Sequence, residues 1–293
     1  MRHTLIACFL MALTSSVFAT GNPPHLTIQA LGAVMSRAVL TYPLREKIYQ
    51  SKLAISRVTN NSNDSTCSNC NVGSGSFTND MKGNGFTTAL TYGFNNHWGA
   101  SLLAGYTSIT GTRTLSLRDD NGALLVPIPA RMGTTDHVNG ADGKGHGFVA
   151  TVSAVWDHWD GDEFRFPLYL GAGVMSIKEE ADATNFGIKR TADVFSPAIL
   201  VGMAPSMNMW KFRAVAFFMI VAALDPGKGT IEDYRLGTKT EIPLVGGLDS
   251  AFPIAGVELT YQPLGIGLSY SPDITSEGAK SVALKWSAEW GGK

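Results

Sequence analysis

Residues 280–290 read KSVALKWSAEW and alternate between apolar and polar or small side chains. One parity carries Val282, Leu284, Trp286, Ala288 and Trp290. A period of two predicts an extended strand with one apolar face and one polar face. An apolar face that ends in tryptophan is typical of a strand that crosses a membrane. Because such a strand needs hydrogen-bonded neighbours on both edges, the rest of the chain is predicted to supply further strands and close a barrel.

Residues 1–19 have the features of a secretory signal peptide. Arg2 and His3 precede the apolar run LIACFLMAL, and a cleavage site with small residues follows at 17–19. Cys8 lies in a lipoprotein-like LIAC sequence, but the apolar run continues past it, which favours the signal peptide. An export signal indicates that the mature protein lies outside the cytoplasm.

Cleavage would remove Cys8 and leave Cys67 and Cys70, spaced C-S-N-C. In an exported chain this spacing predicts a local disulfide rather than a reactive dithiol. Two cysteines alone do not make a zinc site. The net charge of −1, with no basic block, gives no reason to expect a nucleic-acid partner.

The longest wholly apolar run after the signal, residues 214–224, is shorter than the ~20 residues of a membrane helix. A membrane-spanning part must therefore consist of strands. We expect three regions: the signal peptide at 1–19, an N-terminal segment at 20–50 and one all-β barrel at 51–293.

The N-terminal segment 20–50 carries apolar residues at helical spacing within 27–42, and Pro43 would end such a helix. This predicts a helix that occupies the barrel lumen or closes its periplasmic mouth. Arg37 would then be available to pair with an inward acid, Glu258 or Glu289. The alternative is one or two extra strands, such as 26–34.

Alternating segments predict about ten antiparallel strands, with eight or twelve as alternatives: 53–59, 85–94, 98–117, 145–157, 163–176, 195–206, 210–223, 251–261, 265–271 and 280–290. The connections near residues 95, 158, 207 and 263 are short, whereas those near 61, 118, 178 and 225 are long. Alternation of short and long connections is typical of transmembrane barrels.

Five of the six tryptophans lie beside the short turns or at the C-terminus: Trp98, Trp156, Trp159, Trp210 and Trp290. A large apolar ring with one N–H donor favours the membrane interface, so these residues predict an interfacial girdle. Charged residues on the opposite strand parity are expected to face the lumen, where they form ion pairs or tune a pore: Arg165, Lys211, Arg213, Glu258, Lys285 and Glu289.

With signal, strands, turns and girdle in place, the chain resembles bacterial outer-membrane β-barrel proteins over roughly residues 50–290. The resemblance implies an outer-membrane location and contact with outer-membrane lipid, lipopolysaccharide and the barrel-assembly machinery. A helical segment followed by strands is also similar to autotransporter translocator domains, and in particular to solitary autotransporter-like barrels. That family has twelve strands and usually ends on an aromatic residue, whereas this chain has ten predicted strands and ends Trp290-Gly291-Gly292-Lys293.

Two groups of residues are candidates for a catalytic site. Asp119-Asp120 and Asp136-His137 resemble the acidic and Asp–His pairs of omptin proteases, in which a histidine with a carboxylate partner activates water. Here the pairs are adjacent residues within one loop, so solvated loop residues are the alternative. His146 has the parity of a lipid-facing histidine, as a lipid hydrolase requires, but the sequence assigns it no serine partner.

Asp136, Asn139 and Asp142 lack the one-residue spacing of a calcium loop. We therefore predict no catalytic residue, metal or cofactor. The expected function is non-enzymatic: a restricted pore for small solutes, or a structural or surface-interaction role. The alternative is an outer-membrane hydrolase, an omptin-like protease or a lipid-modifying enzyme, with its site at the outer mouth.

Overall fold

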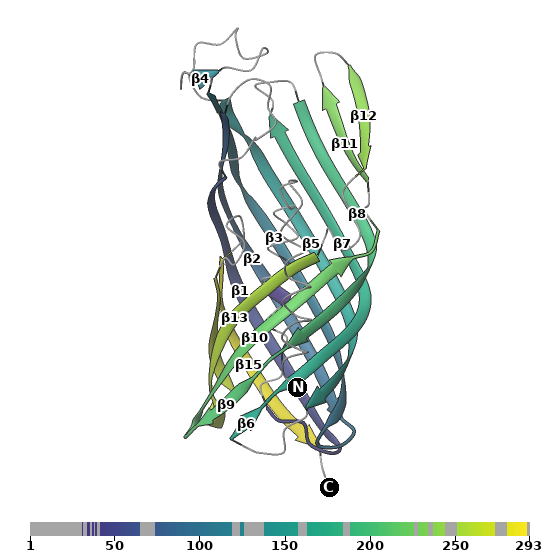
Figure 1. The fold of residues 1–293 in the computed structure, drawn as a ribbon, viewed down its shortest axis with the longest axis vertical. Coiled ribbons are helices and arrows are strands. Elements are labelled where there is room, and N and C mark those ends of the chain that lie inside the picture. Colours follow the sequence, from purple (N-terminus) through teal and green to yellow (C-terminus); the bar gives the residue numbers. More distant parts are fainter. Residues whose placement is uncertain are drawn as a thin grey trace, which may run out of the picture.

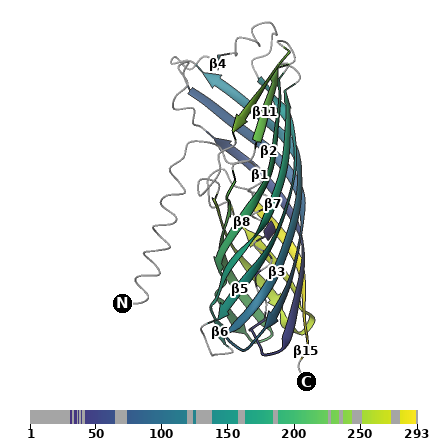
Figure 2. The same cartoon turned by 90° about the vertical axis from the view of Figure 1, so that its right-hand side faces the viewer.

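Ten antiparallel strands close into a barrel in the computed structural model of the protein (Figures 1 and 2). The structure describes residues 31, 34, 35, 37, 39, 42–64, 74–118, 124–125, 138–157, 163–183, 188–225, 228–233, 237–243, 251–272 and 280–291. Eight wall strands are single elements: β1 (Ile48–Asp64), β2 (Ser74–Gly93), β3 (Trp98–Arg118), β5 (Val138–Asp157), β10 (Phe212–Ala223), β13 (Ala251–Tyr261), β14 (Ile266–Ser271) and β15 (Lys280–Gly291).

The other two wall strands are each made of two elements in line. β6 (Phe164–Arg165) and β7 (Pro167–Ala183) are interrupted at Phe166, and β8 (Ile188–Met203) and β9 (Ser206–Met209) at Ala204-Pro205. The ring closes because β1 pairs with β15 and β10 pairs with both β8 and β9. The predicted all-β fold and the count of ten strands are therefore confirmed.

Strand side chains alternate between a buried inner face and an exposed outer face. The outer face is apolar, and its exposed residues include Leu53, Phe86, Leu102, Val152, Leu170, Leu268 and Leu284. The inner face carries many buried polar residues, among them Lys52, Thr91, Ser153, Arg213, Glu258 and Lys285. The inner face also carries a cluster of buried apolar residues, among them Leu103, Val155, Leu200, Phe217 and Met219. An exposed apolar outer face is the reverse of a water-soluble protein, and it suits a wall that faces lipid.

The apolar outer face has a sharp boundary toward the long loops. Arg57 pairs with Asn84, Asn84 with Ser108, Ser108 with His146, His146 with Lys178, and Lys178 with Asp193, so these residues form one continuous outward row across six strands. Two residues closer to the short turns, the outward positions include Phe86, Tyr106, Phe148 and Phe195. The polar row therefore marks the outer limit of the membrane belt.

Several strands continue well beyond that limit. β2, β3 and β5 contain 20, 21 and 20 residues, whereas about 9–11 residues cross a bilayer. The expectation that residues 60–64, 74–76 and 138–144 are loop is wrong, because all of them are strand. Outside the membrane both faces meet water, so the sequence carries no apolar alternation there.

Two further elements extend the barrel at the loop end. The hairpin β11 (Lys228–Asp233) and β12 (Thr238–Pro243) continues the wall along β8, within a region expected to be loop, and β4 (Leu124–Leu125) pairs with β3 (Figure 1). Among the described residues, no helix is long and apolar enough to cross a membrane.

The short turns lie together at the opposite end, called the turn end here. The Asn95 side-chain oxygen accepts hydrogen bonds from the backbone N–H groups of His97 and Trp98, which fixes the β2–β3 turn. The turn expected near residue 207 instead falls at Trp210-Lys211, with Trp210 in the left-handed region (φ 57°). A short 3₁₀ turn, η5 (Gln262–Leu264), links β13 to β14 and ends at Gly265 (φ 64°).

Candidate functional site

The barrel lumen contains part of the N-terminal segment. Its described residues Leu31, Val34, Met35, Arg37 and Val39, called the plug residues here, are all 2% exposed or less. Leu31, Val34 and Met35 are helical and Arg37 lies in a 3₁₀ turn, so none of these residues forms a strand. The structure thus places them inside the ring of wall strands.

Glycines in the wall make room for the plug residues. A Cβ atom at Gly85 would overlap the side chain of Val34, and one at Gly105 would overlap Met35. Both glycines belong to inward positions of β2 and β3. Small inner residues at these two positions therefore allow the plug to lie directly against the wall.

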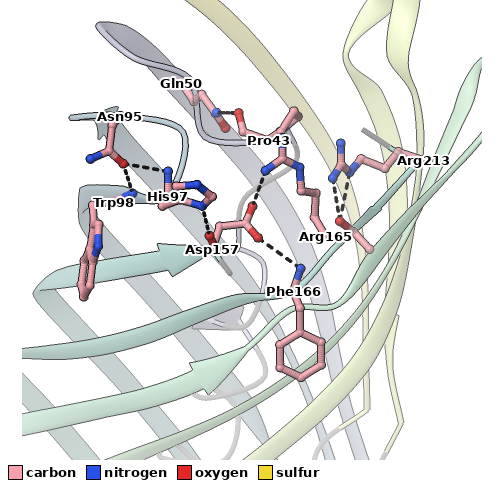
Figure 3. Close-up of polar contacts among 10 residues, drawn as sticks. Pro43, Gln50, Asn95, His97, Trp98, Asp157, Arg165, Phe166 and Arg213 are labelled. Carbon is pink, nitrogen blue, oxygen red and sulfur yellow. Dashed lines mark hydrogen bonds and ion pairs between the residues drawn. The ribbon is translucent and has the colours of Figure 1, made fainter. Parts of the chain in front are cut away.

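Polar side chains of the wall hold the plug backbone. Thr87 donates a hydrogen bond to the Val34 carbonyl oxygen at 2.8 Å, and the Lys52 ammonium donates to the Val39 carbonyl at 2.7 Å. Closer to the turn end, the Gln50 side-chain amide donates to the Pro43 carbonyl at 2.7 Å (Figure 3). These bonds satisfy backbone carbonyls that have left water, which an apolar wall would not do.

The centre of the lumen holds a buried ion cluster. Glu258 on β13 accepts from Lys52 on β1 at 2.7 Å through one carboxylate oxygen, and from Lys285 on β15 through the other. All three side chains are 6% exposed or less. Lys52 thus binds the plug and the wall carboxylate at the same time.

Arg37 does not make the ion pair expected for it. Glu258 is occupied by the two lysines, and Glu289 pairs with Arg45 at 3.6 Å. The Arg37 guanidinium instead donates to the backbone oxygen of Ser281 at 2.8 Å and to the Ser281 hydroxyl. Its Cζ atom lies 5.6 Å from the centroid of the Phe217 ring.

A second polar group lies at the turn end (Figure 3). The Arg165 guanidinium lies 3.5 Å from the Asp157 carboxylate, and both side chains are buried. The other Asp157 oxygen accepts from the Phe166 backbone N–H at 3.3 Å. Arg213 donates to the Ser206 hydroxyl through Nε and Nη2. This group fastens the interrupted strands to their neighbours.

The structure places the six charged residues expected in the lumen as follows. Arg165, Arg213, Glu258 and Lys285 are buried inside, and Glu289 is partly buried near the turn end. Lys211 differs: it is exposed in the β9–β10 turn, where its ammonium lies 4.8 Å from the Trp210 ring centroid. A residue in a two-residue turn does not continue the parity of the strand that follows it.

Aromatic side chains gather at the turn end. Trp98 and Trp156 stack with their ring centroids 6.0 Å apart, and Trp290 stacks on Tyr49 at 6.2 Å. Trp210 is 83% exposed in its turn. Trp159 lies outside the described residues.

Most candidate catalytic residues also lie outside the described residues, namely Asp119, Asp120, Asp136 and His137, as do Cys67 and Cys70 of the expected disulfide. Among the described residues there is no cluster of histidine, cysteine and acidic side chains suited to a metal. His146 is exposed on the outer face, and Ser108 lies directly opposite it in β3. On the other side of His146 lies Lys178. A catalytic histidine would need a carboxylate at that position to orient it.

Sequence reasoning missed Lys52, Gln50 and Asp157. Lys52 lies between Ser51 and Leu53 in β1, and the signal available in the sequence is that its parity is opposite to that of Leu53 and Ile55. The predicted strand begins at residue 53, so Gln50 and Lys52 lie outside the predicted strand, whereas the observed β1 includes both. The sequence places Asp157 at the end of a strand. Its contact with the Arg165 side chain depends on the pairing of Asp157 with Pro167 in the neighbouring strand, which the sequence does not give.

Comparisons with known proteins agree with a barrel fold at low similarity. No protein-family model and no curated protein matches the sequence. Among solved structures, the outer membrane protein OprG from Pseudomonas aeruginosa is 11% identical, with 85% of this chain and 99% of that chain covered and a TM-score of 0.39. The translocator domain of autotransporter NalP from Neisseria meningitidis is 9% identical, with 99% and 95% covered and a TM-score of 0.38.

The outer membrane protease OmpT from Escherichia coli is 10% identical, with 85% and 99% covered and a TM-score of 0.35. At these identities and TM-scores the comparisons carry no argument about activity, and no family model matches the narrower autotransporter-like resemblance. Location rests instead on the chain itself. An apolar outer belt, buried charged and hydroxyl side chains inside the ring, and aromatic residues at the turn end make this protein a transmembrane β-barrel of the bacterial outer membrane.

Proposed function

We propose that the protein is a non-enzymatic barrel that passes small polar solutes, with the plug residues restricting passage. The observation that carries this proposal is the complete burial of Leu31, Val34, Met35, Arg37 and Val39 within a lumen whose wall donates hydrogen bonds to their backbone. A barrel with a purely structural role has no need of a hydrogen-bonding inner wall around a separate segment. The buried polar side chains on the inner faces of β1, β13 and β15 support passage of polar solutes along that part of the wall.

The contacts of the plug support a segment that can move. Wall groups reach its backbone at Val34 and Val39 through single hydrogen bonds from Thr87 and Lys52. Water or a polar solute can replace such bonds at little net free energy, because each contributes only about 0.5–3 kcal/mol. The plug is thus attached at separate points rather than by a continuous strand ladder.

A disulfide between plug and wall tests the proposal. The Val34 Cβ atom lies 3.2 Å from the position of a Cβ atom at Gly85, close to the ~3.5–4.5 Å of natural disulfides. We expect Val34→Cys with Gly85→Cys, in a protein with Cys67 and Cys70 replaced by serine, to form a disulfide in the refolded barrel. Single-channel conductance should be low when oxidised and should rise on reduction.

The matched control pairs Val34→Cys with Gly99→Cys. Gly99 is also an inward wall glycine, but its neighbour is Leu44 rather than Val34, so no disulfide should form and reduction should not change conductance. Removing residues 21–42 while keeping the signal peptide should raise conductance and leave the barrel folded. Equal conductance in the oxidised, reduced and truncated proteins would show that the plug does not restrict the pore.

We also propose outer-membrane lipopolysaccharide as a partner of the outer face. Arg57 lies in the polar row just beyond the apolar belt, and Lys280 on β15 pairs with Thr59, two residues farther along β1; no carboxylate among the described residues pairs with either cation. On the opposite side of the barrel, Lys144 and Lys178 are paired with Glu180 and Asp193 at 3.4 and 3.3 Å. Uncompensated cations at this level suit the phosphates of an outer-leaflet lipid.

Co-purified lipopolysaccharide provides the test. Arg57→Gln with Lys280→Gln should lower the amount retained, whereas Lys144→Gln with Lys178→Gln should change it less. Equal retention by both variants would contradict the assignment. The barrel-assembly machinery is proposed as the insertion partner, and depletion of that machinery should prevent the protein from reaching the outer membrane.

A further inference from the structure

We propose that the lumen contains a binding site for one small, singly charged anion beside Arg37. The ligand class is a halide or the carboxylate group of a small solute. The inference deepens the proposed function by naming the charge of the solute, and only its conduction step rests on that function.

The charges at the centre of the lumen do not balance. Arg37, Lys52 and Lys285 supply three basic side chains, and each is 5% exposed or less. Among the described residues, Glu258 supplies the one carboxylate that contacts this group, and both of its oxygens are engaged by the lysines. Burying unbalanced charge is strongly unfavourable, so one added negative charge stabilises the group.

Two nitrogen atoms of the Arg37 guanidinium are available to donate hydrogen bonds to a further acceptor. Its Nη2 atom binds Ser281, whereas Nε and Nη1 are buried and have no hydrogen-bond partner among the described residues. The side chain is 0% exposed, so bulk water does not solvate these two nitrogens. An unsatisfied guanidinium donor is more costly than an unsatisfied neutral one, which points to an acceptor at this position.

The chemistry of arginine selects an anion rather than proton loss. A guanidinium stays protonated in proteins, whereas a buried lysine can release its proton. The face of Phe217 provides a weak cation–π partner but no hydrogen-bond acceptor. A compact anion supplies the missing acceptor and offsets positive charge that Glu258 alone does not balance.

Other arginines of the same lumen have a carboxylate partner, although Arg165 Nε is also without a hydrogen bond among the described residues. At the turn end, Arg165 contacts the Asp157 carboxylate and Arg45 contacts Glu289. In each of these pairs the guanidinium has a carboxylate of the chain. The described residues provide no such carboxylate for Arg37, and a ligand carboxylate or halide would take the same role.

Thermal unfolding of the full chain in detergent tests binding without any need for conduction. Bromide is the probe, and gluconate, which is too large for a closed site, replaces it at constant ionic strength. We expect bromide to raise the unfolding temperature of the unmodified protein relative to gluconate. The shift should be lost in Arg37→Gln and kept in Lys82→Gln, a change at an exposed cation on the outer face of β2.

Crystals grown in sodium bromide give a second readout that requires no variant. An anomalous peak within hydrogen-bond distance of Arg37 Nε or Nη1 supports the site, and water alone at that position overturns it. The same bromide shift in all three proteins, or none in the unmodified protein, also overturns it.

Reversal potentials in a KCl gradient test the link to passage. The full-length protein should prefer anions, and Arg37→Gln should weaken the preference. Cation preference in the unmodified protein would contradict the link. If the protein carries no current while the bromide peak is present, the pore proposal fails and the anion site stands.

Discussion

A charge placed in the centre of the outer belt should destabilise the barrel strongly. Val152 on β5 is 62% exposed and points to lipid. It lies midway between Trp156, in the aromatic group at the turn end, and Phe148, the last outward aromatic before the polar row. Its position on the strand therefore places it close to the bilayer midplane.

Val152→Arg should lower the free energy of unfolding by about 2–4 kcal/mol, the range for arginine at the midplane of a membrane barrel. His146→Arg is the matched control, because it changes the same strand and face within the polar row and should cost about 0–1 kcal/mol. Denaturant titration of both variants in lipid vesicles, followed by tryptophan fluorescence, measures the difference. Equal stability of the two variants would refute the outer-face assignment and the position of the membrane boundary.

Four other changes test separate parts of the chain. Glu258→Gln should lower the free energy of unfolding by about 3–5 kcal/mol, because it leaves buried cations without their carboxylate; an unchanged denaturant midpoint would contradict the cluster. Gly265→Ala should be destabilising in the same assay, because φ is 64° and the new Cβ atom would overlap the Ser287 carbonyl oxygen. Cys67 and Cys70 should resist thiol labelling in intact, non-reduced cells, and labelling of both would exclude the disulfide. The protein should not hydrolyse phospholipid in mixed micelles; activity that disappears in Ser108→Ala would establish the hydrolase instead.

The membrane-spanning half of the barrel was predictable because each residue there faces either lipid or the lumen. Trp98–Tyr106 in β3 and Phe148–Trp156 in β5 follow that alternation closely. The outer halves of β2 and β5 were not predictable, since both of their faces meet water and turn-forming residues are tolerated. Asn60–Asp64 was assigned to a loop for this reason, although it pairs with Phe77–Met81.

Prediction of the candidate site was less complete. Inward parity identified Arg213, Glu258 and Lys285, but parity along one strand contains no information on which side chains meet across the lumen. The pairing of Lys52 with Glu258 joins β1 to β13, elements separated by most of the chain. Arg37 binds Ser281 because the two lysines occupy both oxygens of Glu258. Which basic side chains bind Glu258 depends on the positions of all the side chains together.

The ion cluster also has a consequence for how the barrel assembles. β1 and β15 are the first and last strands, so their pairing is the seam at which the ring shuts. Lys52 and Lys285 lie on the two sides of that seam and converge on Glu258, while Lys52 also holds the Val39 carbonyl. The Lys52 ammonium group therefore takes part both in closing the ring at the β1–β15 pair and in binding the N-terminal segment. A ring that closed with the segment outside would lack this bond, so the closed barrel with the segment inside is the more stable arrangement.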